Sequence, residues 1–262
     1  MPRAIVTLTT DFGTSDHFVG SMKGVILSLA PQASIVDITH EVKPFAIEEG
    51  AFTIAEAYRA FPKKTIHVVV VDPGVGSARR PVLVQAAGQF FIGPDNGIFS
   101  MICAVEKYAA RHLTNARYFS KAVSRTFHGR DIFAAVAGHL AKGVAPSQFG
   151  PVIKDISRND WFEPQRTSRR VWTGVVLKED RFGNLITNLR MADFDLPNRR
   201  TFEVRIGMQR IHLCVRNYSE APIGELFVLE GSSGYIEVSA NQAYAAKLLG
   251  CGAGAPIEVE IW

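Results

Sequence analysis

The chain has 262 residues, of which 47% are hydrophobic and 21% are charged. This balance is typical of a globular protein with enough apolar material for one large domain or two ordinary ones. The formal net charge is +4, but the basic residues are scattered and form only small clusters at 166–170 and 198–200. Because no long basic run or RNA-binding signature is present, we expect no nucleic-acid partner.

The three cysteines, Cys103, Cys214 and Cys251, lie far apart and form no CxxC pair. They therefore predict neither a disulfide framework nor a zinc site, and they fit a reducing cytoplasm. No apolar run approaches the roughly 20 residues that a membrane-spanning helix needs. The short apolar stretch near the N-terminus leads directly into a predicted strand, unlike a signal peptide. We expect a soluble, cytoplasmic protein without a membrane partner.

The N-terminal half alternates predicted strands and helices. The expected strands are 4–9, 34–38, 68–71, 81–86 and 89–92, and the expected helices are about 16–29, 47–60, 98–105 and 132–141. Such alternation predicts an α/β domain with a mainly parallel central sheet. Ser15 or Asp16 is expected to cap the first helix.

The pattern changes in the second half of the chain. Between 143 and 170 prolines and glycines interrupt it, and we interpret this stretch as a linker or an excursion between domains. Short strands with turn residues between them are then expected at 171–177, 185–189, 201–205, 211–215, 225–229, 235–238 and 256–261. They predict a smaller antiparallel β domain, a sandwich or a barrel. We place the α/β domain at 1–165 and the β domain at 166–262.

Polar residues follow several of the apolar strands. The strand 68–71 ends at Asp72, and similar clusters stand at 9–11, 39–40 and 94–97. A lone Asp-Pro-Gly turn usually ends a strand, with its carboxylate capping a backbone amide. Several such clusters suggest one shared cleft, because the carboxyl ends of parallel strands meet at the rim where open α/β sheets bind ligands.

Three further features near these turns have both a structural and a functional interpretation. Arg79 and Arg80 follow Asp72 closely enough for one of them to fold back toward its carboxylate. His128 precedes the helix 132–141, where Asp131 favours simple capping and the imidazole alternatively favours a catalytic group. The stretch 180–184, Asp-Arg-Phe-Gly-Asn, suits an ordinary β-turn of the second domain.

Taken in order, the stretches 9–13, 72–76, 94–97 and 180–184 resemble those of the S-adenosyl-L-methionine (SAM) hydroxide adenosyltransferases, the DUF62 family, which are relatives of fluorinase and chlorinase. The resemblance extends from Thr7 to about Ile261. It implies a homotrimer in which SAM lies between the N-terminal domain of one subunit and the C-terminal domain of its neighbour. It also implies that water or hydroxide attacks ribose C5′ and releases adenosine and L-methionine.

The resemblance assigns roles to individual residues. Asp72, Arg79 and His128 match the hydrolytic triad, Asp11 the group that holds the ribose hydroxyls, and Phe45 an aromatic wall near adenosine. The residues that match contacts to the methionine portion and the adenine surroundings, or lie nearby in the same pattern, are Asp180, Phe182, Asn184, Ser232, Ser233 and Asn241.

A sulfonium leaves as a neutral thioether, so the enzyme has to hold one water in line with the C5′–S bond. We assign Arg79 to favouring hydroxide, Asp72 to orienting Arg79 and the water, and His128 to taking or relaying the proton. SAM is the substrate, and no cofactor or metal is expected.

Three alternatives remain at the sequence level. A halogenase of the same superfamily carries an aromatic residue at the position of Asp72 and a serine at that of Gly129, and fluorinase has a long loop for which 71–99 leaves no room. A non-catalytic trimer that binds SAM or adenosine would use the same pocket residues. A dinucleotide enzyme is disfavoured, because 74–79 lacks the third glycine of a Rossmann fingerprint.

Overall fold

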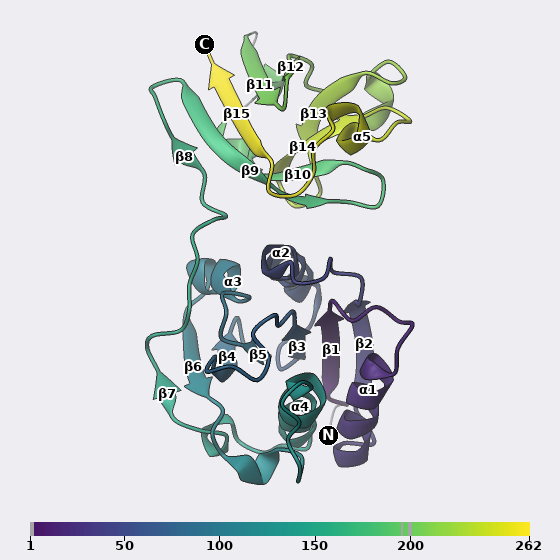
Figure 1. Cartoon of the computed structure of the whole chain (residues 1–262). Helices are drawn as coiled ribbons and strands as arrows, with labels where there is room; N and C mark the ends of the chain where they lie inside the picture. Colours follow the sequence, from purple (N-terminus) through teal and green to yellow (C-terminus); the bar gives the residue numbers. More distant parts are fainter. Residues whose placement is uncertain (1–2, 195, 199–200) are drawn as a thin grey trace. The chain divides into compact units, whose positions relative to one another are not determined.

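The computed structural model describes residues 3–194, 196–198 and 201–262. The chain divides into two compact units, Met1–Asn159 and Asp160–Trp262 (Figure 1). Each unit has its own hydrophobic core. The two arginines of the basic cluster at 198–200, Arg199 and Arg200, lie outside the described residues.

The N-terminal unit is built on a seven-stranded sheet with the order β2-β1-β3-β5-β4-β6-β7. The strands are β1 (Ile5–Thr10), β2 (Ser34–Thr39), β3 (Ile66–Val70), β4 (Pro81–Ala86), β5 (Gln89–Pro94), β6 (Tyr108–His112) and β7 (Val152–Ile153). The pairs β2–β1, β1–β3 and β3–β5 are parallel, whereas β4, β6 and β7 add on in antiparallel fashion. The predicted α/β class is confirmed, with a parallel half that the alternating pattern specified and an antiparallel half beside it. The strands β6 and β7 were not expected.

Helices cover both faces of this sheet (Figure 1). They are α1 (Phe18–Leu29), α2 (Ile47–Ala57), which continues as a 3-10 turn (Tyr58–Ala60), α3 (Ser100–Val105), and a π-helical turn (Gly129–Ala134) that leads into α4 (Ala135–Ala141); 3-10 turns also occur at Ala116–Tyr118 and Pro146–Gln148. The helices α1 and α4 lie on one face, and α2 and α3 on the other. Val19, Met22 and Ile26 of α1 are buried in the core, as an amphipathic helix requires.

The start of α1 differs from the prediction. Its N-cap residue is His17, and no side chain caps it, so neither Ser15 nor Asp16 has the predicted capping role. The aromatic ring of Phe18, the first helical residue, packs 5.8 Å from that of Phe12 and 5.1 Å from that of Phe127. We attribute the later start of the helix to this aromatic packing.

The segment that the sequence identified as a linker or excursion belongs in part to the N-terminal unit. Arg80 Nη1 donates to Asp155 Oδ1 at 2.9 Å, and the amide of Ser157 donates to Asp95 Oδ1 at 2.7 Å. These bonds, together with β7, fasten the chain up to Asn159 onto the rest of the unit.

The C-terminal unit is an antiparallel sheet with the order β12-β11-β15-β9-β10-β14-β13, and β8 pairs with β9. Its strands are β8 (Gln165–Arg166), β9 (Val171–Glu179), β10 (Leu185–Arg190), β11 (Phe202–Ile206), β12 (Gln209–Ile211), β13 (Leu226–Glu230), β14 (Tyr235–Ala240) and β15 (Pro256–Ile261); the unit also has α5 (Ala245–Leu249) and 3-10 turns at Met191–Asp193, Leu196–Asn198 and Tyr218–Glu220.

The two ends of this sheet come together. Beyond β12, the amide of Val215 donates to the carbonyl of Val228 at 3.0 Å, and the amide of Val228 donates to the carbonyl of Leu213 at 2.9 Å. The predicted strand 211–215 is therefore shorter as β12, because its second half turns to pair with β13 instead of β11. The sheet nearly closes into a barrel, which confirms the predicted β-barrel-like domain. The helix α5 was not expected.

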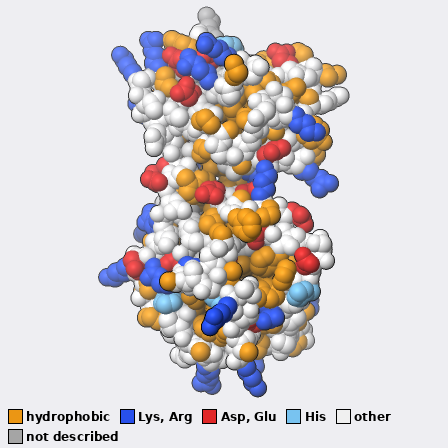
Figure 2. All heavy atoms as spheres, viewed as in Figure 1, with side chains coloured by type: hydrophobic (Ala, Val, Ile, Leu, Met, Phe, Trp, Pro, Cys, Tyr) orange, Lys and Arg blue, Asp and Glu red, His pale blue; other side chains and the backbone are white. Residues whose placement is uncertain are grey.

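The charged surface carries no single basic face in the view of Figure 2, where acidic and basic side chains are interspersed. Among the helices of the described residues, none has the length and apolar character that a membrane span requires.

Candidate active site

Three polar side chains follow neighbouring parallel strands at one rim of the N-terminal sheet. Asp11 follows β1, His40 follows β2, and Asp72 stands two residues beyond the end of β3. In the β1–β3 pair Thr10 lies opposite Val70, so Asp11 and Asp72 emerge side by side. The pKa of Asp11 is raised, first by burial and in smaller part by the charge of Asp72. The parallel topology therefore brings the two predicted carboxylates together.

Arg79 links Asp72 to His128. Its Nε donates to Asp72 Oδ1 at 2.9 Å, and its Nη2 donates to Asp72 Oδ2 and lies 2.8 Å from His128 Nδ1. Because a guanidinium has only donors, Nδ1 of His128 accepts this bond and the ring hydrogen lies on Nε2. The third nitrogen, Arg79 Nη1, is buried and makes no hydrogen bond within the described part of the chain. A buried donor without a partner is costly, so this nitrogen is suited to bind a ligand oxygen or a water.

Two consecutive turns bring Arg79 back onto Asp72. The amide of Val75 donates to the carbonyl of Asp72 at 3.2 Å, and the amide of Ser77 donates to the carbonyl of Gly74 at 3.1 Å. The hydroxyl of Ser77 donates to the same carbonyl at 2.6 Å and accepts from the amide of Arg79 at 3.3 Å. The Pro-Gly-Val-Gly-Ser sequence thus supplies the tight reversal that bidentate pairing requires.

One glycine in this reversal has a second role. Gly76 has a φ of +77°, and a Cβ there would lie 2.4 Å from the carbonyl oxygen of Arg125. Only glycine therefore lets this loop approach the segment that leads to His128.

His128 stands immediately before the π-helical turn. Its pKa is lowered, first by burial and then by the positive charge of Arg79, so the ring is neutral near neutral pH. Asp131, proposed in the sequence as a helix cap, is buried and accepts from the amide of Ser124 at 2.8 Å and from Arg130. Burial alone would raise the pKa of Asp131, but Arg130 and the Ser124 amide together lower it. Asp131 thereby secures the loop that carries His128.

Phe45 stands next to Asp11. Its amide donates to Asp11 Oδ2 at 2.9 Å, its side chain is 71% exposed, and its φ is +69°. A bulky residue held in the left-handed region costs on the order of 1–3 kcal/mol, and such residues cluster at functional sites. An exposed aromatic ring in this conformation beside a carboxylate is a candidate ligand wall.

The stretch 94–97 has a structural role and does not join the triad. Asp95 is bonded to Arg80 and to the amide of Ser157, and a Cβ on Gly97 would lie 2.3 Å from Asn159 Nδ2. This cluster fastens the tail of the N-terminal unit, and the expectation that it shares the cleft stays a prediction. Asn96 Nδ2 also donates to the carbonyl of Val71, the residue before Asp72, at 2.9 Å.

In the C-terminal unit, Asp180 organises the turn between β9 and β10. Its Oδ1 accepts from the amides of Phe182 and Asn184 at 2.8 and 2.9 Å, and its Oδ2 accepts from Asn184 Nδ2 at 3.0 Å. Asn184 is buried, whereas Phe182 is 73% exposed. The turn therefore holds Phe182 out at the surface, as a binding residue requires.

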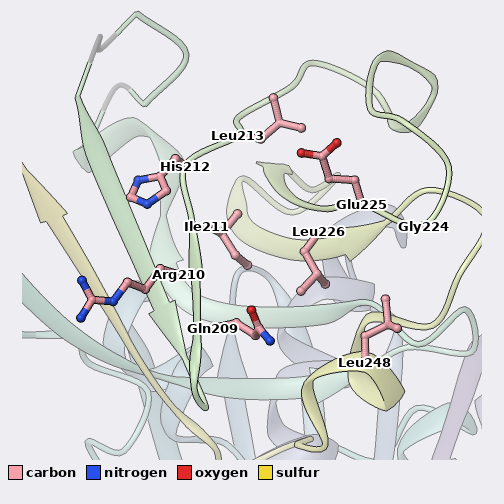
Figure 3. Close-up of a pocket in the computed structure, with 9 residues that line it drawn as sticks. All are labelled: Gln209, Arg210, Ile211, His212, Leu213, Gly224, Glu225, Leu226 and Leu248. Carbon is pink, nitrogen blue, oxygen red and sulfur yellow. The ribbon is translucent and has the colours of Figure 1, made fainter.

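The remaining predicted site residues, Ser232, Ser233 and Asn241, are close in sequence to β13 and β14. Ser232 and Ser233 are in the turn that joins these strands, and Asn241 Nδ2 donates to the carbonyl of Ala221 at 2.7 Å. The pocket of Figure 3, about 620 Å³ in the same unit, is a separate feature that none of the predicted residues lines. Its lining residues are Gln209, Arg210, Ile211, His212, Leu213, Gly224, Glu225, Leu226 and Leu248. Among the described residues no group of three or more His, Cys, Asp or Glu side chains is placed to hold a metal ion.

Comparison with known proteins decides the family. Residues 6–150 match the model of the SAM hydroxide adenosyltransferase N-terminal domain, and residues 174–258 match that of its C-terminal domain. The chain belongs to the SAM hydroxide adenosyltransferase family. The resemblance stated from the sequence motifs is thus confirmed.

Relatives of this SAM hydroxide adenosyltransferase family member include hydrolases and, at greater distance, fluorinases. The chain is 36% identical to the (R)-S-adenosyl-L-methionine hydrolase of Salinispora tropica, over 98% of each chain. It is 27% identical to the fluorinase of an Actinoplanes species, over 97% of each chain. The crystal structure of an uncharacterised conserved protein from Thermotoga maritima superposes with a TM-score of 0.89 at 33% identity, covering 97% of this chain and 99% of the other.

Two aromatic residues of this family member were missed from the sequence. A Cβ on Gly183 would lie 2.6 Å from the ring of Tyr244, which places this half-exposed tyrosine beside Phe182. The hydroxyl of Tyr218 donates to the buried Glu237 at 2.7 Å, and its pKa is raised by burial, by Glu237 and by the charge of Asp180. Tyr218 begins a 3-10 turn and Tyr244 immediately precedes α5, and both elements are too short for periodicity to indicate them.

Proposed function

We propose that this chain hydrolyses SAM to adenosine and L-methionine. The observation that carries the proposal is the arrangement of Arg79, which pairs with Asp72 and His128 and keeps its buried Nη1 as a donor for a nucleophile. The names of the relatives that are about one-third identical over their full length support the same reaction.

The proposed step is a single displacement. A water oxygen attacks C5′ of the ribose, the C5′–S bond breaks, and its electron pair remains on the sulfur of methionine. The sulfonium becomes a neutral thioether, and the proton of the attacking water is released. A nearby guanidinium lowers the pKa of a bound water, and a water-poor pocket favours the loss of charge between hydroxide and sulfonium.

In this proposal each triad residue has a separate task. Arg79 binds the water and favours its hydroxide form, and Asp72 holds Arg79 through a bidentate pair. His128 has its Nδ1 lone pair occupied by Arg79 and its hydrogen on Nε2. His128 can accept the proton only after it releases Arg79. Its first role in the proposal is therefore to bind Nη2 of Arg79, so that Nη1 of Arg79 remains available for the water.

Substrate binding in the proposal uses both units. Asp11 holds the ribose hydroxyls and Phe45 covers the nucleoside. From the C-terminal unit, Asp180, Phe182, Asn184, Ser232, Ser233 and Asn241 complete the site. Phe45 and Phe182 are both largely exposed in their own units, as expected of rings that another surface covers. We propose that this surface belongs to the neighbouring subunit of a homotrimer. We also propose that the protein works in a reducing cytoplasm, which keeps the three free cysteines reduced.

The halogenase alternative is less well supported. The carboxylate of Asp72 at the site would repel a halide. Gly129 also lacks the hydroxyl of the serine that the halogenases carry at this position.

The test is to incubate the purified protein with SAM and to follow the products by chromatography. Hydrolysis gives adenosine and methionine in equal amounts, and added fluoride or chloride leaves the product unchanged. Binding of SAM without any product would instead identify a non-catalytic binding protein, and a 5′-halogenated nucleoside would identify a halogenase.

A further inference from the structure

A row of polar side chains in mutual contact lies next to Asp11, outside the triad. Thr10 Oγ1 lies 2.8 Å from His40 Nδ1, and His40 Nε2 lies 3.0 Å from Asp37 Oδ1. Asp37 is in turn bonded to Lys23 at 2.5 Å. Thr10 and His40 are buried, whereas Asp37 and Lys23 are partly exposed. This row of side chains therefore extends from the end of β1, past the end of β2, to the surface.

The direction of these hydrogen bonds follows from the chemistry of the groups. An ionised carboxylate only accepts, so His40 Nε2 carries a hydrogen. In the neutral ring Nδ1 then accepts from the hydroxyl of Thr10. The same hydroxyl oxygen accepts from the amide of Phe12 at 3.3 Å. The side chain of Thr10 thereby ties His40 to the backbone that flanks Asp11.

The backbone makes two further ties between the same loops. The amide of Gly13 donates to the carbonyl of His40 at 2.8 Å, and the amide of Val42 donates to the carbonyl of Thr10 at 3.3 Å. His40 thus holds the turn that contains Asp11 from both sides, through its ring and through its carbonyl. Of the two ring nitrogens, Nδ1 is hydrogen-bonded to Thr10, whereas Nε2 is buried 3.0 Å from Asp37 Oδ1 and has no hydrogen bond of good geometry within the described residues. A buried polar pair of this kind is costly, which favours a specific role for it.

We propose that His40 is a positioning residue that acts through Thr10 to fix the carboxylate of Asp11 for the ribose hydroxyls. This inference rests on the proposed function, which gives Asp11 that ligand. His40 itself does not touch the substrate in this scheme. Supporting side chains of this kind fix the orientation of a binding group, and their loss costs affinity for the one ligand portion that the group holds.

The test replaces the hydroxyl of Thr10 while keeping its shape. Thr10→Val removes the bonds of this hydroxyl to His40 and to the amide of Phe12, and Thr10→Ser retains both. The matched control is Thr9→Val, because Thr9 is equally buried and its hydroxyl makes no hydrogen bond within the described residues. Binding of adenosine and of 2′,3′-dideoxyadenosine, which lacks both ribose hydroxyls that Asp11 would hold, is measured by calorimetry for each variant.

We expect Thr10→Val to weaken adenosine binding on the order of tenfold and to leave dideoxyadenosine binding unchanged. Thr10→Ser and Thr9→Val should bind both nucleosides like the parent protein. If Thr10→Val weakens both nucleosides equally, its effect is general and the inference is overturned.

A second measurement separates this inference from the proposed function. The carboxyl of Asp11 is titrated by NMR in the parent, in Thr10→Val and in Thr9→Val. A loosened turn exposes this carboxyl, so its raised pKa should fall toward the ordinary range in Thr10→Val alone. If the parent binds neither nucleoside, the proposed function fails, and the titration alone decides whether His40 positions Asp11. An identical titration in all three proteins refutes the positioning role.

Discussion

The Nη2 atom of Arg79 lies 2.8 Å from Nδ1 of His128, although 49 residues separate the two along the chain. This contact defines the tautomer of His128 and keeps its ring neutral, because a protonated ring would have no lone pair for the guanidinium. The candidate triad is therefore one hydrogen-bonded unit in which each member limits what the others can do.

The activity should fall at acidic pH, with its midpoint below the ordinary histidine value. Burial and Arg79 lower the pKa of His128 from about 6.5. Between the two pKa values the unfolded state binds the proton more readily. The stability contributed by neutral His128 is therefore full above about pH 6.5 and is lost as the pH falls toward the lower, folded value. Rate profiles from pH 5 to 9 measure the pH dependence of the activity, and NMR titration of the His128 ring measures its pKa. A loss of activity on acidification that is centred above pH 7 would contradict the role of neutral His128.

Removing the triad carboxylate should slow turnover and spare binding. Asp72→Asn and Asp72→Ala lose the bidentate hold on Arg79, and we expect kcat to fall roughly 10²–10⁴-fold with little change in adenosine affinity. His128→Ala should act in the same direction. Asp155→Asn is the matched control, since Asp155 is also paired with an arginine, Arg80, but lies in the tail segment. A collapse of affinity together with rate would make Asp72 a binding group.

The new oxygen of adenosine should come from water in one displacement. Reaction in ¹⁸O-labelled water should place the label on the 5′-hydroxyl, and a stereospecifically deuterated substrate should show inversion at C5′. We expect inversion because both oxygens of Asp72 are engaged by Arg79, which makes the carboxylate a poor nucleophile. Net retention would indicate a covalent ester on Asp72, and exchange of the C4′ hydrogen would indicate elimination.

Two inactive variants should restore activity to each other if the site lies between subunits. Asp72→Ala disables the N-terminal contribution and Phe182→Ala the C-terminal one, and truncation of the exposed Phe182 should cost little stability. Subunits mixed after reversible dissociation should regain part of the parent rate, whereas each variant alone stays slow. Light scattering should give the mass of a trimer; an active monomer would exclude a shared site.

The close approach of Gly97 to Asn159 should make this glycine sensitive to substitution. Gly97→Ala has to strain a φ of +95° and displace the Asn159 amide, so we expect a loss of about 3 kcal/mol in the free energy of unfolding. Gly143→Ala is the control: its φ is +101° but no atom lies within 4 Å of its added Cβ, so about 1 kcal/mol is expected. Equal urea midpoints for the two variants would show that only backbone strain matters at Gly97.

Local sequence patterns were enough to predict the parallel half of the first sheet and the antiparallel hairpin that follows it. The apolar run 68–71 and the Ala87-Gly88 turn predicted β3 and the β4–β5 hairpin, because burial on both faces and tight turns leave local signals. The strand β6 escaped notice because its sequence, Tyr-Ala-Ala-Arg-His, neither alternates nor forms an apolar run. Five-residue α5 is too short for helical periodicity to emerge.

The candidate site could be predicted only in part. The return of Arg79 onto Asp72 is local, since turn residues between them announce it. The pairing with His128 depends on tertiary packing and entered through the family resemblance alone. Asp95 follows the end of a strand, as Asp72 does, but it anchors the tail of the N-terminal unit. A carboxylate at a strand end predicts only that the residue lies at the rim of the sheet, and not what it binds there.

The π-helical turn Gly129–Ala134 has a consequence for how this family can vary in length. A π-helical turn holds one residue more than an α-helical turn, as if a single residue had been inserted into the helix that ends with α4. Because the widened turn absorbs the extra residue, the segments before and after it keep nearly the phase of a continuous α-helix. Deleting that residue would therefore rewind the turn as an α-helix and leave His128 close to its present orientation toward Arg79. A one-residue gap in this segment is thus no sign that a sequence has lost the triad.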